Sequence, residues 1–179
     1  QLASVDNHLE SDPEKARTKL ATAREMVEHS LSEARDSLTG LRVPAAAESL
    51  DFPGSMLGIM QDRCHEASID LEVQPNGDQS TIELGTEVAY ACHRILLEAL
   101  ANTIRHSGAG KVNVTLIKAD KQWQFTVRDD GNGFDAQTPA GIGHYGLQGM
   151  KERARNIDAE LDISSSKDGT AVTLTLPLE

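Results

Sequence analysis

Residues 93–109, HRILLEALANTIRHSGA, restrict the possible folds of this chain more than any other stretch. The apolar side chains recur at the spacing of one helical face: Ile95, Leu96, Ala99, Leu100 and Ile104. The polar side chains fall on a neighbouring stripe: Glu98, Asn102, Arg105 and His106. Because an apolar stripe of this kind has to be buried against another layer, the pattern predicts a helix over about residues 84–106 that lies on a sheet and carries polar groups along one edge.

Strand and helix patterns alternate around this stretch. Alternating apolar and polar residues predict five strands at 69–74, 111–120, 122–130, 159–166 and 170–178, with a turn expected at 75–79. Helical spacing predicts two further helices at 52–66 and 147–157. We therefore expect residues 56–179 to form the α/β part of an α+β chain, a two-layer sandwich with helices on one face of a mixed sheet of about five strands. The stretch VPAAAESLDFPGS (43–55) contains two prolines and a glycine, which indicates a linker at 45–55.

The first 44 residues follow a different pattern. Ser11 or Asp12 caps a helix, Pro13 takes its first position, and Glu14 completes a capping box with Ser11. Apolar residues then form a heptad-like seam: Leu20, Val27, Leu31, Ala34, Leu38 and Leu41. Pro44 ends the helix. We expect residues 1–44 to be part of a helical hairpin, with the seam buried against a partner chain or against a missing first helix.

Charge and composition limit the possible partners. The net charge of −11 argues against nucleic acid as the main partner, since duplex binding needs a clustered basic surface. A polyanion such as a nucleotide would need a site made locally from backbone N–H groups, a metal ion or a few basic residues. No apolar run approaches the roughly 18 residues of a membrane span. Cys64 and Cys92 lack the spacing of a zinc site and are expected to be buried free thiols.

Two segments carry oxygen ligands next to permissive backbone. Glu98 and Asn102 lie one helical turn apart and offer the hard oxygen ligands that Mg²⁺ accepts, although such a pair is also common on a solvated helix flank. In DDGNGFD (129–135), Asp129 at a strand end could accept a hydrogen bond from an exocyclic amine, and Gly131 and Gly133 could admit a ligand close to the backbone. An ordinary acidic turn is the alternative for this segment. A calcium loop would need further ligands and a closing glutamate, which are absent.

Two further segments could bind anions or form turns. GIGHYGLQGMKER (141–153) places glycines before a helix that carries Lys151 and Arg153, an arrangement that can cradle an anion. It matches neither a Walker nor a Rossmann motif. In KDGTAV (167–172), Gly169 and Thr170 could simply form a hairpin turn.

In chain order, these four segments resemble the catalytic ATP-binding domain of two-component sensor histidine kinases, the Bergerat or GHKL fold. EALANTIRHSGA is similar to its N box, DDGNGF and GIGHYGLQGM to its two glycine boxes, and DGTAVTLTLP to its last motif. HSGA and MKERA are most similar to the kinases that partner NarL-type regulators, the nitrate-sensor and DesK-like subfamily. Residues 12–42 resemble the second helix of that subfamily's dimerisation hairpin, so the resemblance covers nearly the whole chain.

The resemblance implies a role for each matching residue. Asn102 would ligate Mg²⁺, and Glu98 would orient a metal-bound water or assist phosphoryl transfer, which makes these two the expected catalytic residues. Asp129 would read the adenine amine, with Thr170 supporting it through a water. The other implied ATP-binding residues are Arg105 and His106 at the phosphates, Gly131 and Gly133 at the base, and Gly143, Gly146 and Leu147 at the lid.

The resemblance also implies partners and shows departures. The implied full-length protein is a homodimer. Its kinase domain would be cytoplasmic and would pass phosphate to a NarL-type response regulator, and any membrane anchor would lie upstream. Tyr145 stands where many relatives have glycine. None of the six histidines, His8 included, combines a place on the first hairpin helix with a following acid. We therefore expect the phosphate acceptor upstream of Gln1, and a fragment that binds ATP but lacks its own acceptor.

Two other functions fit part of the pattern. A serine kinase or ATPase of the same GHKL fold would share the nucleotide motifs, but it has no reason to carry a heptad seam ending in LR before the domain. A module that dimerises and binds nucleotide without catalysis would also fit, although Glu98, Asn102 and Asp129 are all present. Because most of the first hairpin helix is missing, we also expect weak dimerisation of this fragment.

Overall fold

The computed structural model describes residues 52–76, 84–119, 121–134 and 145–178, together with five single positions of the first segment, Arg17, Lys19, Leu20, Ala23 and Val27. The chain divides into two units, residues 1–45 with 140–148 and residues 46–139 with 149–179, and each is described by itself. The predicted linker up to residue 51, the rest of the predicted hairpin and Gly143 lie outside the described residues.

Nine elements follow one another in the described ranges: α3 (Gly54–Glu66), β1 (Asp70–Asn76), α4 (Thr86–Asn102), a π-helical turn (Thr103–Ser107), β2 (Lys111–Ala119), β3 (Gln122–Asp129), α5 (Tyr145–Asn156), β4 (Glu160–Ser166) and β5 (Gly169–Pro177). The strands form one sheet in the order β1-β2-β3-β5-β4. β1 runs parallel to β2, and the other neighbours pair antiparallel. The predicted mixed sheet of five strands is confirmed.

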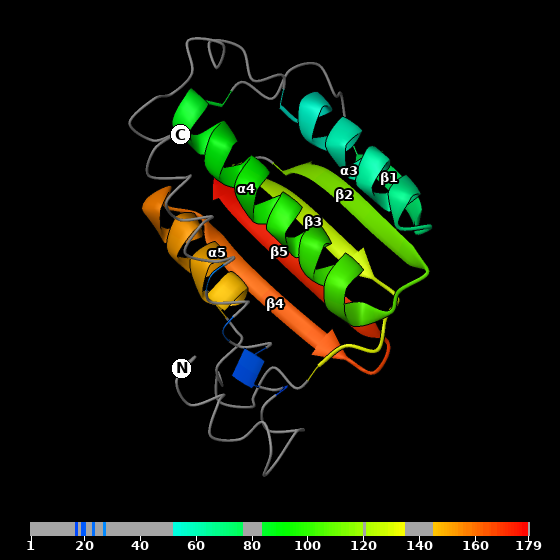
Figure 1. The fold of residues 1–179 in the computed structure, drawn as a ribbon. Helices are drawn as coiled ribbons and strands as arrows, with labels where there is room; N and C mark the ends of the chain where they lie inside the picture. Colours follow the sequence, from blue (N-terminus) through cyan, green and yellow to red (C-terminus); the bar gives the residue numbers. More distant parts are fainter. Residues whose placement is uncertain are drawn as a thin grey trace. The chain divides into compact units, whose positions relative to one another are not determined.

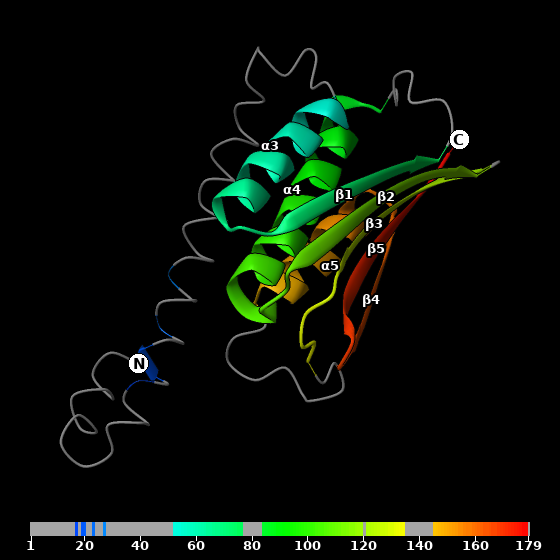
Figure 2. The same cartoon turned by 90° about the vertical axis from the view of Figure 1, so that its right-hand side faces the viewer.

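The helices gather on one face of this sheet, as predicted. α3 contacts β1, and α4 contacts the central strands β3 and β5. Figures 1 and 2 show α3, α4 and the part of α5 from Gly149 onward on the same face, while no described helix covers the opposite face. Figure 1 also places the C-terminal end of α4 near the end of β3 and the start of β5.

Strict alternation along the central strands builds the core. The side chains that point toward the helices are buried: Val112, Val114 and Leu116 on β2, Trp123, Phe125 and Val127 on β3, and Val172, Leu174 and Leu176 on β5. The register places Val114, Val127 and Val172 in one row across three strands. Phe52 meets Phe125 edge to face, with ring centroids 5.4 Å apart. Three aromatic residues, Phe52, Trp123 and Phe125, therefore lie in an otherwise aliphatic core.

The apolar stripe of α4 is buried as the sequence predicts. Its fully or nearly fully buried members are Ala89, Cys92, Ile95, Leu96, Ala99 and Leu100, which recur every three or four residues. Cys92 on α4 and Cys64 on α3 are both buried free thiols. Burial raises the pKa of Cys92 to about 12, so this thiol stays protonated and acts as a small core residue.

Two boundaries differ from the sequence-based expectation. β1 continues through Pro75 and Asn76, where a turn was expected. A proline is tolerated there because β1 is an edge strand. The N–H group that proline lacks is not needed on the side of the strand that has no neighbour. The helix at 84–106 also does not remain α-helical, because α4 ends at Asn102 and residues 103–107 form a π-helical turn.

The described positions of the first segment bear on the predicted seam. Leu20 and Val27 are 44% and 57% exposed. Exposed apolar side chains of this size are typical of interaction surfaces, and burial of the seam against another helix stays a prediction. Separately, no helix among the described residues has both the length and the hydrophobicity needed to cross a bilayer.

Candidate functional site

The carboxylate of Asp129 is the centre of a buried polar cluster at the end of β3. Asp129 is only 4% exposed. Its Oδ1 accepts backbone N–H hydrogen bonds from Gly131 (2.9 Å) and Thr170 (3.1 Å). Its Oδ2 accepts the hydroxyl hydrogen bond of Thr103 (2.8 Å). Three donors from three parts of the chain thus hold one carboxylate, which compensates for its burial.

Glycine at three positions allows this close arrangement. Gly169 has a φ of +118°, and a Cβ at this position would overlap the carbonyl of Asp129. Gly131 packs so closely against Ser107 that a Cβ would lie 2.5 Å from the Ser107 Cβ. Gly133 similarly lies against the carbonyl of Ser166. Gly131 and Gly133 thus bring the loop after β3 against the π-helical turn and the end of β4, and Gly169 brings the start of β5 against the end of β3.

Further hydrogen bonds join the loop after β3 to the end of the π-helical turn. The N–H of Asn132 donates to the Ser107 carbonyl at 2.9 Å. Asp130 Oδ1 accepts the backbone N–H groups of Gly110 and Lys111, both at 2.9 Å. The DDGNG segment is therefore a tightly bonded loop in this structure, and its two aspartates have different tasks: Asp130 bonds backbone and is exposed, whereas Asp129 is buried.

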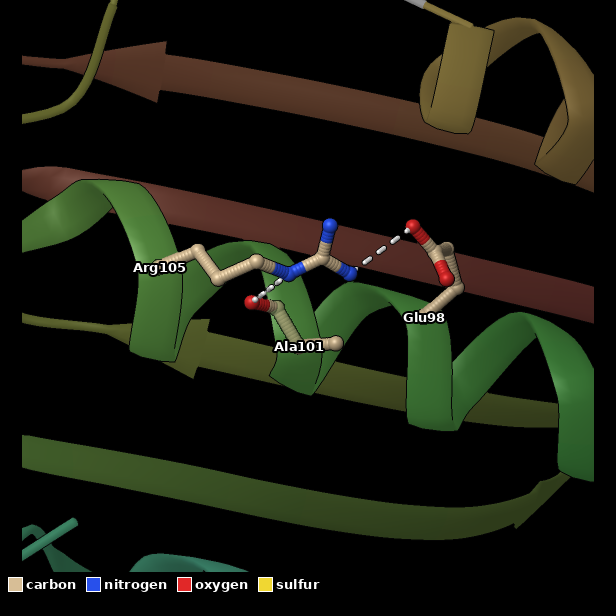
Figure 3. Close-up of polar contacts among 3 residues, drawn as sticks. All are labelled: Glu98, Ala101 and Arg105. Carbon is tan, nitrogen blue, oxygen red and sulfur yellow. Dashed lines mark hydrogen bonds and ion pairs between the residues drawn. The ribbon is translucent and has the colours of Figure 1, made fainter. Parts of the chain in front are cut away.

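The polar edge of α4 is organised more loosely. Arg105 runs back along the helix, donating from Nε to the Ala101 carbonyl (3.1 Å) and approaching Glu98 Oε1 with Nη2 (3.4 Å), as Figure 3 shows. The side chains of Arg105 and Glu98 are 44% and 28% exposed. His106 is exposed, and Asn102 is half-buried. The acid and base of the predicted stripe thus pair with each other at the surface.

Along the chain, Asn102 links the polar edge of α4 to the Asp129 cluster. It is the last residue of α4, and the next residue, Thr103, donates to Asp129. Glu98 lies one helical turn before Asn102 on the same helix. Among the described residues, no group of three or more His, Cys, Asp or Glu side chains is placed to hold a metal ion. A cation at Glu98 and Asn102 would therefore need most of its ligands from a bound molecule and water.

The structure brings some of the predicted site residues together and leaves others apart. Asp129, Gly131 and Thr170 share one cluster, but Thr170 contributes its backbone N–H, while its hydroxyl lies 2.9 Å from that of Ser165. Gly146 and Leu147 lie in the first turn of α5, within the other unit, so their place at a lid stays a prediction. Gly143 lies outside the described residues.

Two residues of this cluster were not found from the sequence. Thr103 follows directly on Asn102 and was hidden in the helical pattern, because its contact with Asp129 joins residues 26 positions apart. Ser165 accepts the N–H of Phe134 at 2.8 Å and so joins the loop after β3 to β4. The only local signal for Thr103 was a polar residue next to the apolar stripe of α4, which by itself indicates nothing specific.

Comparison with known proteins decides the family. Residues 87–179, more than half of the chain, match the family described as histidine kinase-, DNA gyrase B- and HSP90-like ATPases. The chain belongs to this family. Residues 1–47 match a second family described simply as histidine kinase, and this match precedes the ATPase match in the chain. The resemblance recognised in the four motifs is confirmed, and this histidine kinase region contains a nucleotide-binding domain.

Curated relatives of this histidine kinase region carry kinase names. The signal transduction histidine-protein kinase/phosphatase DegS of Brevibacillus brevis is 28% identical over 166 residues, which cover 92% of this chain and 42% of DegS. The sensor histidine kinase YdfH of Bacillus subtilis is 33% identical over 99 residues, covering 54% of this chain and 24% of YdfH. The sensor histidine kinase MctS of Rhizobium johnstonii is 29% identical over 136 residues, covering 75% of this chain and 29% of MctS. The chain spans less than half of each relative.

Solved structures show the same fold. Histidine kinase AdeS of Acinetobacter baumannii superposes with a TM-score of 0.61 at 16% identity, over 99% of this chain and 95% of that one. The histidine kinase domain of the blue-light activated kinase of Erythrobacter litoralis superposes with a TM-score of 0.57 at 21% identity, over 69% of this chain and 59% of that one.

Proposed function

We propose that this histidine kinase region binds Mg-ATP between the end of α4 and the loop after β3, and donates the γ-phosphoryl group to a histidine. The observation that carries the proposal is the buried Asp129 carboxylate, bonded by three protein donors at the end of β3. An anionic acceptor held in one orientation is suited to an exocyclic amine such as the 6-amino group of adenine. Asp129 would therefore select the base, with Gly131 and Gly133 beside it.

The phosphates would lie toward the polar edge of α4. Arg105 and His106 are exposed there, and the Arg105 guanidinium would have to leave only an exposed ion pair with Glu98 and a hydrogen bond to the Ala101 carbonyl. Arginine suits phosphate because its planar donors can bind two oxygens at once. Gly143, Gly146 and Leu147 are proposed as the lid side of the same site, on the strength of the sequence motif alone.

The donor set at Glu98 and Asn102 fits a magnesium ion shared with the nucleotide. Both side chains offer hard oxygens one turn apart on α4, and neither is deeply buried. We propose that Asn102 ligates the ion directly and that Glu98 holds one of its waters. When bound, the ion would neutralise charge on the phosphates. The residues of the chain itself would fix the position of the nucleotide, which is most of what phosphoryl transfer asks of a protein.

The phosphate acceptor and the protein partners form the second part of the proposal. The acceptor is proposed to be a histidine on the dimerisation hairpin, since none of the six histidines stands in that motif here. The exposed Leu20 and Val27 support burial of the seam in a homodimer of the full-length protein. From the histidine, the phosphate would pass to an aspartate of a NarL-type response regulator. Such a protein would act in the cytoplasm, with any membrane anchor in other segments.

Calorimetric titration of the 179-residue chain with Mg-ATP tests the nucleotide site. The wild type should bind, and Asp129→Asn should weaken binding by about 100-fold, because an amide cannot satisfy the same set of donors and the ligand amine together. Asp130→Asn is the matched control. Asp130 is the neighbouring carboxylate, but it is exposed and bonded to backbone of another loop, so its loss should leave the affinity within about threefold. Equal affinity in wild type and Asp129→Asn would contradict the adenine assignment.

Phosphoryl transfer needs a separate measurement. Incubation of the chain with labelled ATP and a histidine-containing peptide of the proposed first hairpin helix should label a histidine of the peptide. Binding of Mg-ATP without any labelled peptide would favour the alternative of a nucleotide-binding module that dimerises without catalysis.

A further inference from the structure

Building on the nucleotide site proposed above, we infer that Thr103 positions Asp129 for a 6-amino purine and thereby sets the selectivity of the site for adenine over 6-oxo purines. The hydroxyl of Thr103 is the one protein donor found on Oδ2 of Asp129 among the described residues, at 2.8 Å. Thr103 is itself only 6% exposed, so neither partner of this hydrogen bond is freely solvated.

The Asp129 carboxylate keeps one acceptor site for a ligand beside Thr103. A carboxylate has about four lone-pair sites, two on each oxygen. Oδ1 already accepts two backbone N–H groups, those of Gly131 and Thr170. Thr103 takes one site on Oδ2. A single acceptor site on Oδ2 therefore remains for a donor from outside the cluster.

One remaining acceptor site discriminates between purines. The 6-amino group of adenine donates and can fill that site, whereas the 6-carbonyl of hypoxanthine presents lone pairs to a carboxylate and is repelled. Discrimination of this kind depends on a carboxylate that cannot turn away. The Thr103 hydroxyl must be the donor, since an ionised carboxylate only accepts, and it fixes Oδ2 at the end of α4.

The place of Thr103 also links base recognition to the proposed metal ligand. Thr103 is the first residue of the π-helical turn and directly follows Asn102. The Ser107 hydroxyl donates to the Thr103 carbonyl at 2.8 Å, which ties this turn together. One residue thus holds the end of α4 and the end of β3 in a common frame, so Thr103 is a positioning residue and need not touch the nucleotide.

Thr103→Val tests the inference, because valine keeps the branched shape, removes the hydroxyl and leaves no room for a replacing water. Dissociation constants of ADP and of inosine diphosphate, which differs from ADP at position 6 of the purine, should be measured by calorimetry on the 179-residue chain. The variant should bind ADP roughly tenfold more weakly, the usual loss for a hydrogen bond to a charged group. Inosine diphosphate should lose much less, so the ADP preference should fall by a similar factor.

Two control variants separate positioning from general loosening. Thr126→Val makes the same change on β3, on the sheet face away from Asp129, where the Thr126 and Thr173 hydroxyls lie 3.1 Å apart. This variant should leave the ADP preference unchanged. Thr103→Ser keeps the hydroxyl and should retain most of the preference. If Thr103→Val does not fold, Thr103→Ala removes the same hydroxyl and is judged by the same ratio.

Each possible result either supports the inference or overturns it. A reduced ADP preference in Thr103→Val, with both controls near wild type, supports the inference. An unchanged ratio overturns it, whether both nucleotides weaken equally or neither changes, because Thr103 would then have no role in selectivity. That result would leave the proposed nucleotide site intact. Failure of the wild type to bind ADP at all would instead overturn the nucleotide site, and the inference with it.

Discussion

The two halves of the proposed site hold their carboxylates in different ways. Asp129 is buried and accepts three hydrogen bonds of 2.8 to 3.1 Å from residues on three elements. Glu98 is 28% exposed, and its partner Arg105 reaches it at 3.4 Å from the same helix. A carboxylate fixed by tertiary contacts is organised before any ligand arrives, whereas an exposed ion pair on one helix can rearrange at little cost. The proposed base end of the site is therefore rigid, and the proposed phosphate end is adaptable.

The difference suits the two tasks. Recognition of a purine edge depends on the direction of hydrogen bonds, so a fixed acceptor is an advantage. Phosphates and their metal ion bring several charges and waters, and side chains that can move accommodate them. The largest expected effects of substitution should accordingly fall on the Asp129 cluster and the smallest on the outer side of α4.

The largest effect is expected for Gly169→Ala. A Cβ would overlap the carbonyl of Asp129, and the φ of +118° is unfavourable for alanine. We expect a loss of about 2 to 4 kcal/mol in the free energy of unfolding, measured by urea denaturation. Gly110→Ala is the control at the same end of the sheet, because no atom lies within 4 Å of a Cβ there. Similar stabilities of the two variants would show that the Asp129 cluster tolerates movement.

A smaller and more specific effect is expected for Asn102→Ala. The wild type should bind ATP at least about tenfold more tightly with Mg²⁺ than with EDTA, and the variant should lose most of that gain. Affinity for ATP in EDTA should stay nearly constant, because the Asp129 cluster is untouched. Calorimetry in the two buffers gives both numbers. A variant that keeps the full magnesium dependence would remove Asn102 from the metal site.

The outer pair should contribute little to stability. Glu98→Gln and Arg105→Gln should each change the free energy of unfolding by less than about 0.5 kcal/mol, as is usual for exposed ion pairs. Their double variant should show a coupling energy of similar or smaller size, measured by urea denaturation. Coupling of more than about 1 kcal/mol would mean that this edge is as firmly built as the Asp129 cluster.

The smallest expected effect is a change in the free energy of unfolding with pH that depends on His93 of α4. Burial, followed by the positive charges of Arg94 and Arg63, lowers the pKa of His93 below its usual value of 6.5. Below about pH 6.5, the unfolded chain binds a proton that the folded chain does not, so the free energy of unfolding should decrease as the pH falls. Urea denaturation at pH 7.5 and 5.5 should show a smaller decrease in His93→Gln. His106→Gln, a change at an exposed position, should keep the wild-type decrease.

Much of the fold follows from the sequence because it depends on local periodicity. The alternation along β2, β3 and β5 and the stripe on α4 are properties of short segments, and their strands and helix appear as expected. The π-helical turn was not predicted, since apolar spacing through Ile104 is compatible with an uninterrupted α-helix. The extension of β1 through Pro75 was missed because a proline usually ends a strand, and only the position of β1 at the sheet edge permits it.

The site was predicted in its members more than in its contacts. Motif spacing identified Asp129 and the glycines after it, but it could not reveal that Thr103 bonds Asp129, which depends on how α4 lies against the sheet. For the same reason, the sequence could not show that the backbone N–H of Thr170 bonds Asp129 directly; support from Thr170 through a water stays a prediction. The pairing of Arg105 with Glu98 spans seven residues, and Arg105 lies within the π-helical turn, which alters the helical spacing.

The central claim is that one nucleotide binds the rigid Asp129 cluster with its base and the adaptable edge of α4 with its phosphates. Backbone amide chemical shifts, recorded by NMR on the 179-residue chain, test it most directly. Adenosine should shift the amides of Gly131 and Thr170, which donate to Asp129, and leave those of Glu98 and Arg105 in place. Mg-ATP should shift all four. Saturating Mg-ATP that leaves Gly131 and Thr170 unshifted would contradict the account.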